Sequence, residues 1–586
     1  MFEYTVILGL VGLVVVDFAW RFTKHIRAAQ RSGLPYVVAP YQPSIIFMIF
    51  IGSKLIPYLV KNWLPTWMGD IMKDNVATWR WSLKNKQKER YGGVYFIATP
   101  RGLTCNVGDA SVACQIVNAR HGFAKPVFQY QILDMYGPNL VTCEDKEWAH
   151  HRRHTATTFH EKNNDLVWRE SVRQAREMTE YWQKTYPVPI PQGLGFEVKE
   201  TRDDIHKLTL NVISCAGFGV ELPFEPIPQD SLKNTKDVFK DSPTPAPGFD
   251  FTFRSVVAYM NVQIPTMALA NRLLPAWVPR VLVPFFKDDF AAYRDLDQYL
   301  QKLINLSKSK VTDAETASNL IEGMILSSRL GDSKDVGLSD REIISNMHIF
   351  TIAGHETTAT TMRYTLLLLA LNQEVQDWVY DGISEATKNE PSDSKDWDYE
   401  RMFPKLVTPL CVMLETMRLF PPVTTVPKWT GETSSTIYYR ENKYVLEPKT
   451  IVNLNANCLH YSEEYWGSDA PQFRPQRWDV RNQKSFLAQN ADMPGLAGPG
   501  LEYPTIHKPV RGAYLPFSDG FRACLGKKFA QVEFVATFAV LLRDYQVELA
   551  DSSEQGRKNA IRIMDESNSV ITLAMRENVP LRFRKR

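Results

Sequence analysis

The sequence has few cysteines, and they follow no pairing pattern. There are 7 in 586 residues, an odd number, and no two are spaced as Cys-x-x-Cys, which argues against a disulfide framework and against a zinc site. An excess of one charge is also lacking, because 68 basic residues are balanced by 65 acidic ones and the net charge is +3. That balance gives no reason to expect a nucleic-acid partner.

Repeats and nucleotide-binding motifs are missing as well. We find no internal repeat and no Gly-x-Gly-x-x-Gly placed after a strand, so a built-in nicotinamide or flavin domain is not expected. Apolar side chains are abundant instead. Of all residues, 44% are hydrophobic and 12% aromatic, which is ample for a sizeable core, and the cysteine usage fits a reducing compartment.

One long apolar run lies at the amino terminus, over residues 4–20, with Asp17 as its only charge. Seventeen residues is at the short edge of a spanning helix. Basic residues follow at Arg21, Lys24, Arg27 and Arg31, which the positive-inside rule places on the cytosolic side. We expect residues 1–30 to form a single-pass membrane anchor, with a buried core helix as the alternative.

A proline-containing hinge and a second apolar run follow in residues 31–69. The run, Ile45–Val60, could cross the membrane, lie in its interface or dock on the remaining chain. Residues 70–586 are predicted to form one large, mainly α-helical domain with a minor β-sheet component. Its strand-like pieces are Val94–Ala98, Lys443–Leu446, Ile451–Leu454 and Val570–Met575.

The most informative segment is residues 516–526, which read Pro-Phe-Ser-Asp-Gly-Phe-Arg-Ala-Cys-Leu-Gly. A cysteine thiolate is a soft ligand that can hold haem iron, and the apolar helix expected after Cys524 would favour the deprotonated sulfur. Gly520 permits a tight turn, and Gly526 lets the backbone pass close to a flat macrocycle. Arg522 could pair with a haem propionate. The alternative is a buried structural cysteine.

At these residues the chain resembles the cytochromes P450, whose haem-binding loop reads Phe-x-x-Gly-x-Arg-x-Cys-x-Gly. The pattern is matched by Phe517, Gly520, Arg522, Cys524 and Gly526. The resemblance implies the fold of that family and a haem b whose iron has the Cys524 thiolate as its axial ligand. It also implies insertion of one oxygen atom from dioxygen into an organic substrate.

A helix predicted from Ser339 to Asn372 carries the second motif. Ser339 and Glu342 form a capping box at its start, whereas the Gly-His-Glu-Thr-Thr stretch at 354–358 is poor in helix formers and predicts a local widening or kink. The stretch resembles the family's distal helix. By resemblance, Thr357 would hydrogen-bond the oxygen being activated, and Glu356 would relay protons. A plain helix with a solvent-facing Gly-Thr patch is the alternative.

A shorter helix is predicted from Leu406 to Leu419, with Thr408 as its cap. Glu415 and Arg418 are three residues apart and can pair on one face, most simply as a surface salt bridge of little energy. The resemblance implies more, because residues 473–478 match the family's Phe-x-Pro-x-Arg-Trp element. In that pattern Arg477 joins the pair in a buried structural network.

Trp148 and Arg152 lie four apart on a helix predicted to be capped near Thr142. They resemble the family's Trp-x-x-x-Arg pair, which binds a haem propionate, and Lys428 falls where the family often has Arg or His in that role. Three histidines nearby have no Cys, Asp or Glu at a recognisable metal-ligand spacing, so they are expected on a polar helix face. They are His150, His151 and His154.

The resemblance implies that NADPH supplies electrons indirectly, through a separate flavoprotein reductase at the endoplasmic reticulum membrane, with the catalytic domain in the cytosol. We expect a monomer acting on a lipophilic substrate, similar to fungal enzymes of secondary metabolism. Fatty acid and sterol oxidation are further possibilities. Two other functions are weighed against this: a haem-thiolate isomerase or dehydratase that needs no reductase, and a membrane-anchored haem sensor. The intact acid–threonine pair disfavours both.

Overall fold

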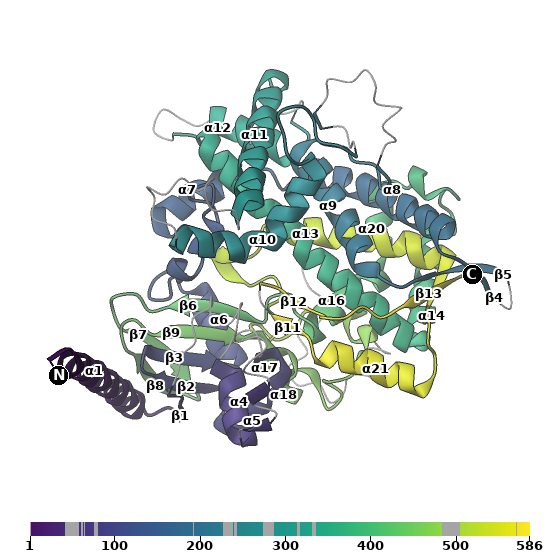
Figure 1. Cartoon of the computed structure of the whole chain (residues 1–586). Coiled ribbons are helices and arrows are strands. Elements are labelled where there is room, and N and C mark those ends of the chain that lie inside the picture. The colour runs from purple at the N-terminus through teal and green to yellow at the C-terminus, as the bar shows by residue number, and fades with distance from the viewer. Residues whose placement is uncertain are drawn as a thin grey trace. The chain divides into compact units, whose positions relative to one another are not determined.

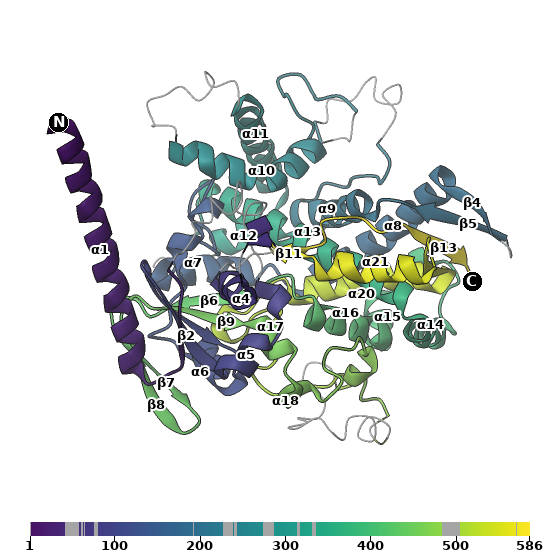
Figure 2. The ribbon, with the colours of Figure 1, turned by 60° about the horizontal axis from the view of Figure 1, so that its bottom comes forward.

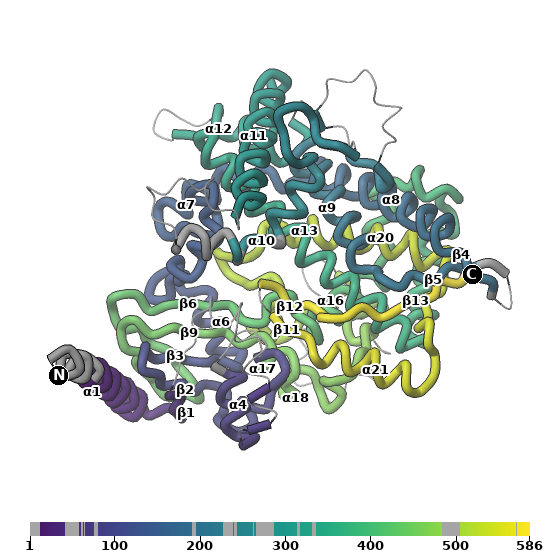
Figure 3. Tube along the Cα trace, viewed as in Figure 1, coloured from purple at the N-terminus to yellow at the C-terminus, as the bar shows by residue number. Residues whose placement is uncertain are grey.

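The computed structural model describes most of the chain, drawn in colour along the tube of Figure 3. The described residues are 2–40, 58–59, 62–63, 65–75, 80–190, 193–226, 238–239, 243–273, 286–312, 317–330, 336–482, 484, 504–569 and 571–586. Most of the second apolar run, Ile45–Val60, lies outside the described residues.

The chain divides into two compact units, each assembled from separate stretches of sequence. Unit 1 comprises residues 1–126, 415–524 and 564–576, and unit 2 comprises residues 127–414, 525–563 and 577–586. Helices dominate and the sheets are small (Figure 1), which confirms the predicted fold class. The predicted boundaries at residues 30 and 69 stay predictions.

Unit 1 is built around a five-stranded sheet in the order β1-β2-β3-β9-β6. β2 pairs antiparallel with β3, and β3 pairs parallel with β9. Every residue of β2 is buried, as expected for a strand covered on both faces. The strands are β1 (Tyr36–Val38), β2 (Val94–Thr99), β3 (Gly102–Val107), β6 (Thr425–Trp429) and β9 (Ile451–Asn455).

The other elements of unit 1 surround this sheet. Two strand pairs, β7 (Ser435–Tyr439) with β8 (Asn442–Leu446) and β11 (Asn568–Ser569) with β12 (Leu573–Ala574), form separate small sheets. The predicted strands near 94, 443 and 451 are therefore confirmed. The helices are α1 (Phe2–Ser32), α4 (Thr66–Asn75), α5 (Lys86–Tyr91), α6 (Ala110–Asn118), α17 (Ala456–His460) and α18 (Glu463–Trp466).

Helix α1 joins the sheet only through its last turns (Figure 2). Ala28 and Ala29 are buried there, and His25 Nδ1 donates to the carbonyl oxygen of Thr99 at 2.8 Å. Over the residues whose side chains are described, no helix combines the length and apolar character needed to cross a membrane. Residues 4–11 of the predicted anchor lie outside that set.

Unit 2 is a helical assembly whose longest element is α13 (Asp340–Leu371). Helix α9 packs against α13 and α8, and α8 packs against α20 (Figure 1). A four-stranded sheet, β10-β13-β5-β4, closes one end. Its strands are β4 (Pro187–Ile190), β5 (Gly193–Val198), β10 (Tyr545–Leu549) and β13 (Leu581–Lys585). The helices are α7 (Asp145–Ala156), α8 (Glu161–Thr185), α9 (Thr201–Phe218), α10 (Phe253–Leu273), α11 (Lys287–Lys310), α12 (Leu320–Arg329), α14 (Gln373–Thr387), α15 (Tyr399–Met402), α20 (Lys527–Asp544) and α21 (Glu554–Asp565).

Helix α13 follows the predicted boundaries closely. Ser339 is its N-cap, and the capping box with Glu342 is complete. The helix is α-helical without interruption from Asp340 to Leu371, so the local widening predicted near Gly354 does not occur. The threonines are accommodated by bonding within the helix, since Thr357 Oγ1 donates to the Ala353 carbonyl oxygen at 2.7 Å.

Candidate functional site

The cysteine loop lies in unit 1 and is held by its own backbone. The Cys524 N–H donates to the Phe517 carbonyl oxygen at 2.9 Å, and the Ala523 N–H donates to that of Gly520 at 3.1 Å. Cys524 is the exposed cysteine of the chain, whereas Cys105 and four others are buried and Cys114 is half-buried. The fold therefore presents this one thiol on a fixed loop, which is the arrangement a metal-binding thiolate needs.

Gly520 fixes the position of this loop against α6. Its φ is +68°, a left-handed conformation that glycine adopts without strain. A Cβ at this position would lie 2.2 Å from the Val117 carbonyl oxygen. Glycine is thus required both for the turn and for the close approach of the backbone to α6.

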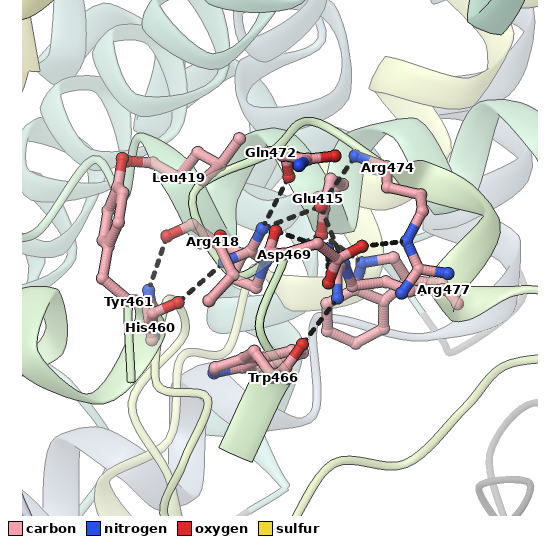
Figure 4. A network of polar contacts seen from close by, with 12 residues as sticks. Glu415, Arg418, Leu419, His460, Tyr461, Trp466, Asp469, Gln472, Arg474 and Arg477 are labelled. Atoms are coloured by element: carbon pink, nitrogen blue, oxygen red, sulfur yellow. Dashed lines mark hydrogen bonds and ion pairs between the residues drawn. The ribbon is translucent and has the colours of Figure 1, made fainter. Parts of the chain in front are cut away.

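A buried ionic network sits beside the loop in unit 1 (Figure 4). Glu415 Oε1 accepts from Arg418 Nη2 at 2.8 Å and from Arg477 Nε at 2.9 Å, and all three side chains have no exposed surface. The pair predicted from sequence is thus buried rather than a surface salt bridge. Glu415 is carried by α16 (Val407–Leu419), the predicted second helix. Thr408 lies inside α16 and donates to the Val379 carbonyl oxygen at 3.2 Å, so its predicted role as a cap is wrong.

The network is fully satisfied by hydrogen bonds. Burial raises the pKa of Glu415, but the Arg418 and Arg477 guanidinium groups outweigh it and bring that pKa to about 2. The guanidinium groups also donate to backbone carbonyl oxygens, among them Arg477 Nη1 to Trp466 at 2.9 Å and Arg418 Nη1 to His460 at 2.8 Å. Such pairing is what allows three charges to be buried together.

His460 connects this network to the cysteine loop, a role that sequence reasoning missed. Its Nδ1 donates to the Arg418 carbonyl oxygen at 3.1 Å, and its Nε2 accepts from the Leu515 N–H at 3.0 Å. Burial, and then the Arg418 charge, lower the pKa of His460 to about 3. The imidazole is therefore neutral, and one nitrogen can donate while the other accepts. Leu515 directly precedes the loop.

Lys428 lies next to the loop as well. It comes from β6, is almost fully buried, and its Nζ lies 5.6 Å from the centre of the Phe521 ring. Arg522 follows Phe521 at the end of the short 3-10 helix Gly520–Arg522. Within unit 1 the fold therefore brings together three of the predicted site residues, Cys524, Arg522 and Lys428.

Unit 2 carries the predicted acid and alcohol. Most side chains of α13 are buried, yet Ala353 is exposed, and Gly354 and Thr357 are half-buried. The centre of the helix thus has a stretch of small residues that is accessible rather than buried. The Glu356 carboxylate lies 3.5 Å from His206 Nε2 of α9.

Trp148 and Arg152 lie on α7 in unit 2, both half-buried and one turn apart. The helix starts at Asp145 after Glu144 as N-cap. The N-cap is therefore two residues from Thr142, near which it was predicted, and Thr142 itself accepts a hydrogen bond from the Asn139 N–H at 3.1 Å.

The histidines of α7 correct a second expectation. His151 and His154 are buried rather than on a polar face, and ligand atoms of Cys143, Glu147 and His151 lie within 4.8 Å of one another. This set, whose members are spaced four residues apart, was not expected from the sequence. The Asn346 amide nitrogen lies 2.8 Å from His151 Nδ1. Because that amide donates, the proton of the neutral ring is on Nε2, which cannot then ligate a metal.

Each of the two units thus carries some of the predicted site residues. Unit 1 carries Cys524, Arg522 and Lys428, and unit 2 carries Trp148, Arg152, Glu356 and Thr357. Within unit 1, the exposed thiol of Cys524 on its hydrogen-bonded loop fits a haem-binding thiolate.

Comparisons with known proteins agree with this picture. The family model for cytochrome P450 matches residues 66–564. A cytochrome P450 monooxygenase of Arthrobotrys oligospora is 29% identical over 98% of this chain and 97% of its own length. Another, from Penicillium rubens, is 29% identical over 96% and 94%. A monooxygenase of the phomenoic acid biosynthesis cluster of Leptosphaeria maculans is 22% identical over 96% and 94%.

Proposed function

Because the chain belongs to the cytochrome P450 family of oxidoreductases, we propose that it inserts one oxygen atom from dioxygen into a lipophilic organic substrate. The observation that carries this proposal is the Cys524 loop, which combines an exposed thiol, a fixed backbone and a buried supporting network. Members of the family hold haem through a cysteine thiolate, and the residues present fit that group. In balanced form, R–H, dioxygen, NADPH and a proton give R–OH, NADP⁺ and water.

Bound haem supplies the redox chemistry, since a thiolate ligand donates electron density to iron and favours O–O cleavage. The chain's own residues then hold the group and move protons. Cys524 provides the sulfur, and the cationic groups of Arg522 and Lys428 would pair with propionates. Trp148 and Arg152 of α7 would donate further hydrogen bonds to them.

Proton delivery is assigned to Glu356 and Thr357. The Thr357 hydroxyl donates to the Ala353 carbonyl oxygen, but a hydroxyl can rotate and also accept. It can therefore take a proton from one side while it donates on the other. Glu356, the neighbouring residue, is the acid that would supply this proton.

The electrons come from a partner, in our proposal a separate NADPH-dependent flavoprotein reductase. The family match extends over residues 66–564, and members of this family commonly receive their electrons from a separate protein. The Leptosphaeria maculans relative is named for a biosynthetic cluster. This name supports a substrate in a fungal secondary-metabolite pathway. We further propose that the enzyme is a monomer.

Membrane attachment at the endoplasmic reticulum is also proposed for residues 1–30. The described part of α1 exposes a run of large apolar side chains, namely Leu13, Val14, Val15, Val16, Phe18 and Trp20. The four basic residues that follow would lie at the cytosolic headgroups. Resistance of the expressed protein to alkaline carbonate extraction would support a spanning anchor, and release by carbonate would refute it.

The decisive experiment for the function is spectroscopic and then catalytic. Reduced protein with carbon monoxide should give the red-shifted band of thiolate-ligated haem, and Cys524→Ser should abolish it. Screening hydrophobic metabolites by substrate-induced difference spectra should identify a ligand, which reductase and NADPH should then convert to an oxygenated product. Conversion of the ligand without NADPH would instead indicate an isomerase or dehydratase.

A further inference from the structure

His206 faces Glu356 from the neighbouring helix. The residue lies on α9, which packs against α13, and its Nε2 is 3.5 Å from Glu356 Oε2. Its side chain is 18% exposed and that of Glu356 is 32% exposed. The pair is therefore neither buried nor a freely solvated surface contact. His206 thus has partial access to solvent and also faces the acid assigned to proton delivery.

The hydrogen bond of the other ring nitrogen, Nδ1, shows whether a proton must lie between His206 and Glu356. His206 Nδ1 is 2.8 Å from the Arg202 carbonyl oxygen. A carbonyl oxygen only accepts, so Nδ1 must carry a proton. In a neutral ring Nε2 then carries a lone pair and no proton. This lone pair would face a lone pair of the carboxylate oxygen. One proton on Nε2, donated to the carboxylate oxygen, removes this conflict.

The surroundings favour His206 over its neighbour as the proton carrier. His355 lies beside it, with ring centres 5.2 Å apart. Burial, and then His206, lower the pKa of His355 to about 3, so that ring stays neutral. Other charged groups near the pair are Arg202 and Asp203 on α9 and Arg363 on α13.

We propose that His206 is the outer proton donor of the site and reprotonates Glu356 from solvent. In each cycle the proton on Nε2 passes to Glu356 Oε2, which leaves a neutral ring that keeps its proton on Nδ1. A proton from water or buffer then returns to Nε2. An imidazole suits this task because one ring nitrogen can release a proton while the other keeps its own. The inference rests on the proposed function of Glu356.

Two substitutions of His206 distinguish a role in proton transfer from a purely structural role. In His206→Asn the amide nitrogen can still donate to the Arg202 carbonyl oxygen, but nothing faces Glu356. In His206→Gln an amide reaches the position of Nε2 and can hydrogen-bond Glu356, but it carries no transferable proton. His121→Gln replaces an exposed histidine of unit 1 and serves as the control.

The catalytic test uses the full-length holoenzyme with reductase, NADPH and an identified substrate. Direct proton transfer by a positioned side chain contributes about 10²–10⁴-fold, and water can partly replace an outer donor. We therefore expect kcat to fall about tenfold in both His206 variants, more NADPH to be lost to hydrogen peroxide, and substrate affinity to stay unchanged. The His121 variant should match wild type. Wild-type kcat and coupling in His206→Asn, alongside an uncoupled Glu356→Gln, would overturn the inference and leave the proposed function standing.

An NMR measurement that needs no catalytic turnover tests whether a proton lies between His206 and Glu356. In ¹⁵N-histidine-labelled holoenzyme, the His206 signal is the one missing from His206→Gln. It should show a protonated Nδ1, and its Nε2 resonance should move to that of a neutral Nδ1–H ring in Glu356→Gln. An unmoved resonance would refute the inference. This arm remains informative if no substrate is oxidised, a result that would instead count against the proposed function.

Discussion

His460 accepts a hydrogen bond from the backbone N–H of Leu515 at 3.0 Å, immediately before the cysteine loop. The same ring donates to the Arg418 carbonyl oxygen at 3.1 Å. Since Arg418 is buried and paired with Glu415, the start of the cysteine loop is hydrogen-bonded to a buried ionic network of unit 1. The network therefore supports the Cys524 loop through one neutral imidazole.

Replacing His460 with Phe should loosen the cysteine loop. The change leaves the buried Leu515 N–H without its acceptor, which costs about 1–3 kcal/mol. We expect a smaller haem content per polypeptide and a lower melting temperature. His460→Gln can keep one of the two hydrogen bonds and should fall between wild type and His460→Phe. Full haem retention in both variants would contradict this role.

Replacing Glu415 with Gln should be more damaging. It leaves the buried guanidinium group of Arg418 without a counter-charge and that of Arg477 with Asp469 alone. Breaking a buried ion pair in this way costs about 3–5 kcal/mol. We expect most of the protein to be recovered without the carbon monoxide band of thiolate-ligated haem. Glu447→Gln removes an exposed partner of Arg31 and should change stability by about 1 kcal/mol or less. Equal effects of the two substitutions would refute the role of the buried network.

Glu533 gives a prediction of pH dependence. This α20 residue is 1% exposed, and burial raises its carboxyl pKa well above the ordinary 4.5, with the Thr358 hydroxyl acting in the opposite direction. Above pH 4.5 the unfolded chain has lost this proton while the folded chain keeps it. The free energy of unfolding therefore falls by about 1.4 kcal/mol per pH unit until the folded pKa is reached.

Glu533→Gln lacks this titration. Its stability relative to wild type should be independent of pH below about pH 4, where both carboxyl forms are protonated, and should increase as pH rises above 4.5. Melting temperatures measured from pH 4 to pH 7 test the trend. Glu554→Gln, at a residue whose side chain is 82% exposed, is the control and should show no such trend. A pH-independent difference for Glu533→Gln would mean that this carboxyl is ionised in the folded protein.

Local signals in the sequence predicted the elements that local interactions decide. The bounds of α13 follow from its capping box, and the strands near residues 94, 443 and 451 follow from their apolar patterns. Thr142 and Thr408 do not cap α7 and α16, because their side chains form other hydrogen bonds. Thr142 binds the Asn139 N–H, and Thr408 binds the Val379 carbonyl oxygen.

Contacts between distant residues could not be read from sequence in the same way. His460 is 42 residues from Arg418 and 55 from Leu515, and no local pattern marks it. Glu415, Arg418 and Arg477 were grouped only by resemblance to a family motif. His206 faces Glu356 because α9 packs against α13, a fact of tertiary structure alone.

Gly520 provides a prediction that separates backbone strain from steric contact. Gly520→Ala places a residue with a Cβ at φ +68° and brings that atom 2.2 Å from the Val117 carbonyl oxygen. Gly431 has φ +73°, but a Cβ added there would meet no atom within 4 Å, so Gly431→Ala isolates the conformational cost of about 1 kcal/mol. We expect Gly520→Ala to lose clearly more stability and, because the loop must shift away from α6, to lose haem as well. Gly431→Ala should keep its haem. Equal losses in the two variants would mean that the contact with α6 does not position the cysteine loop.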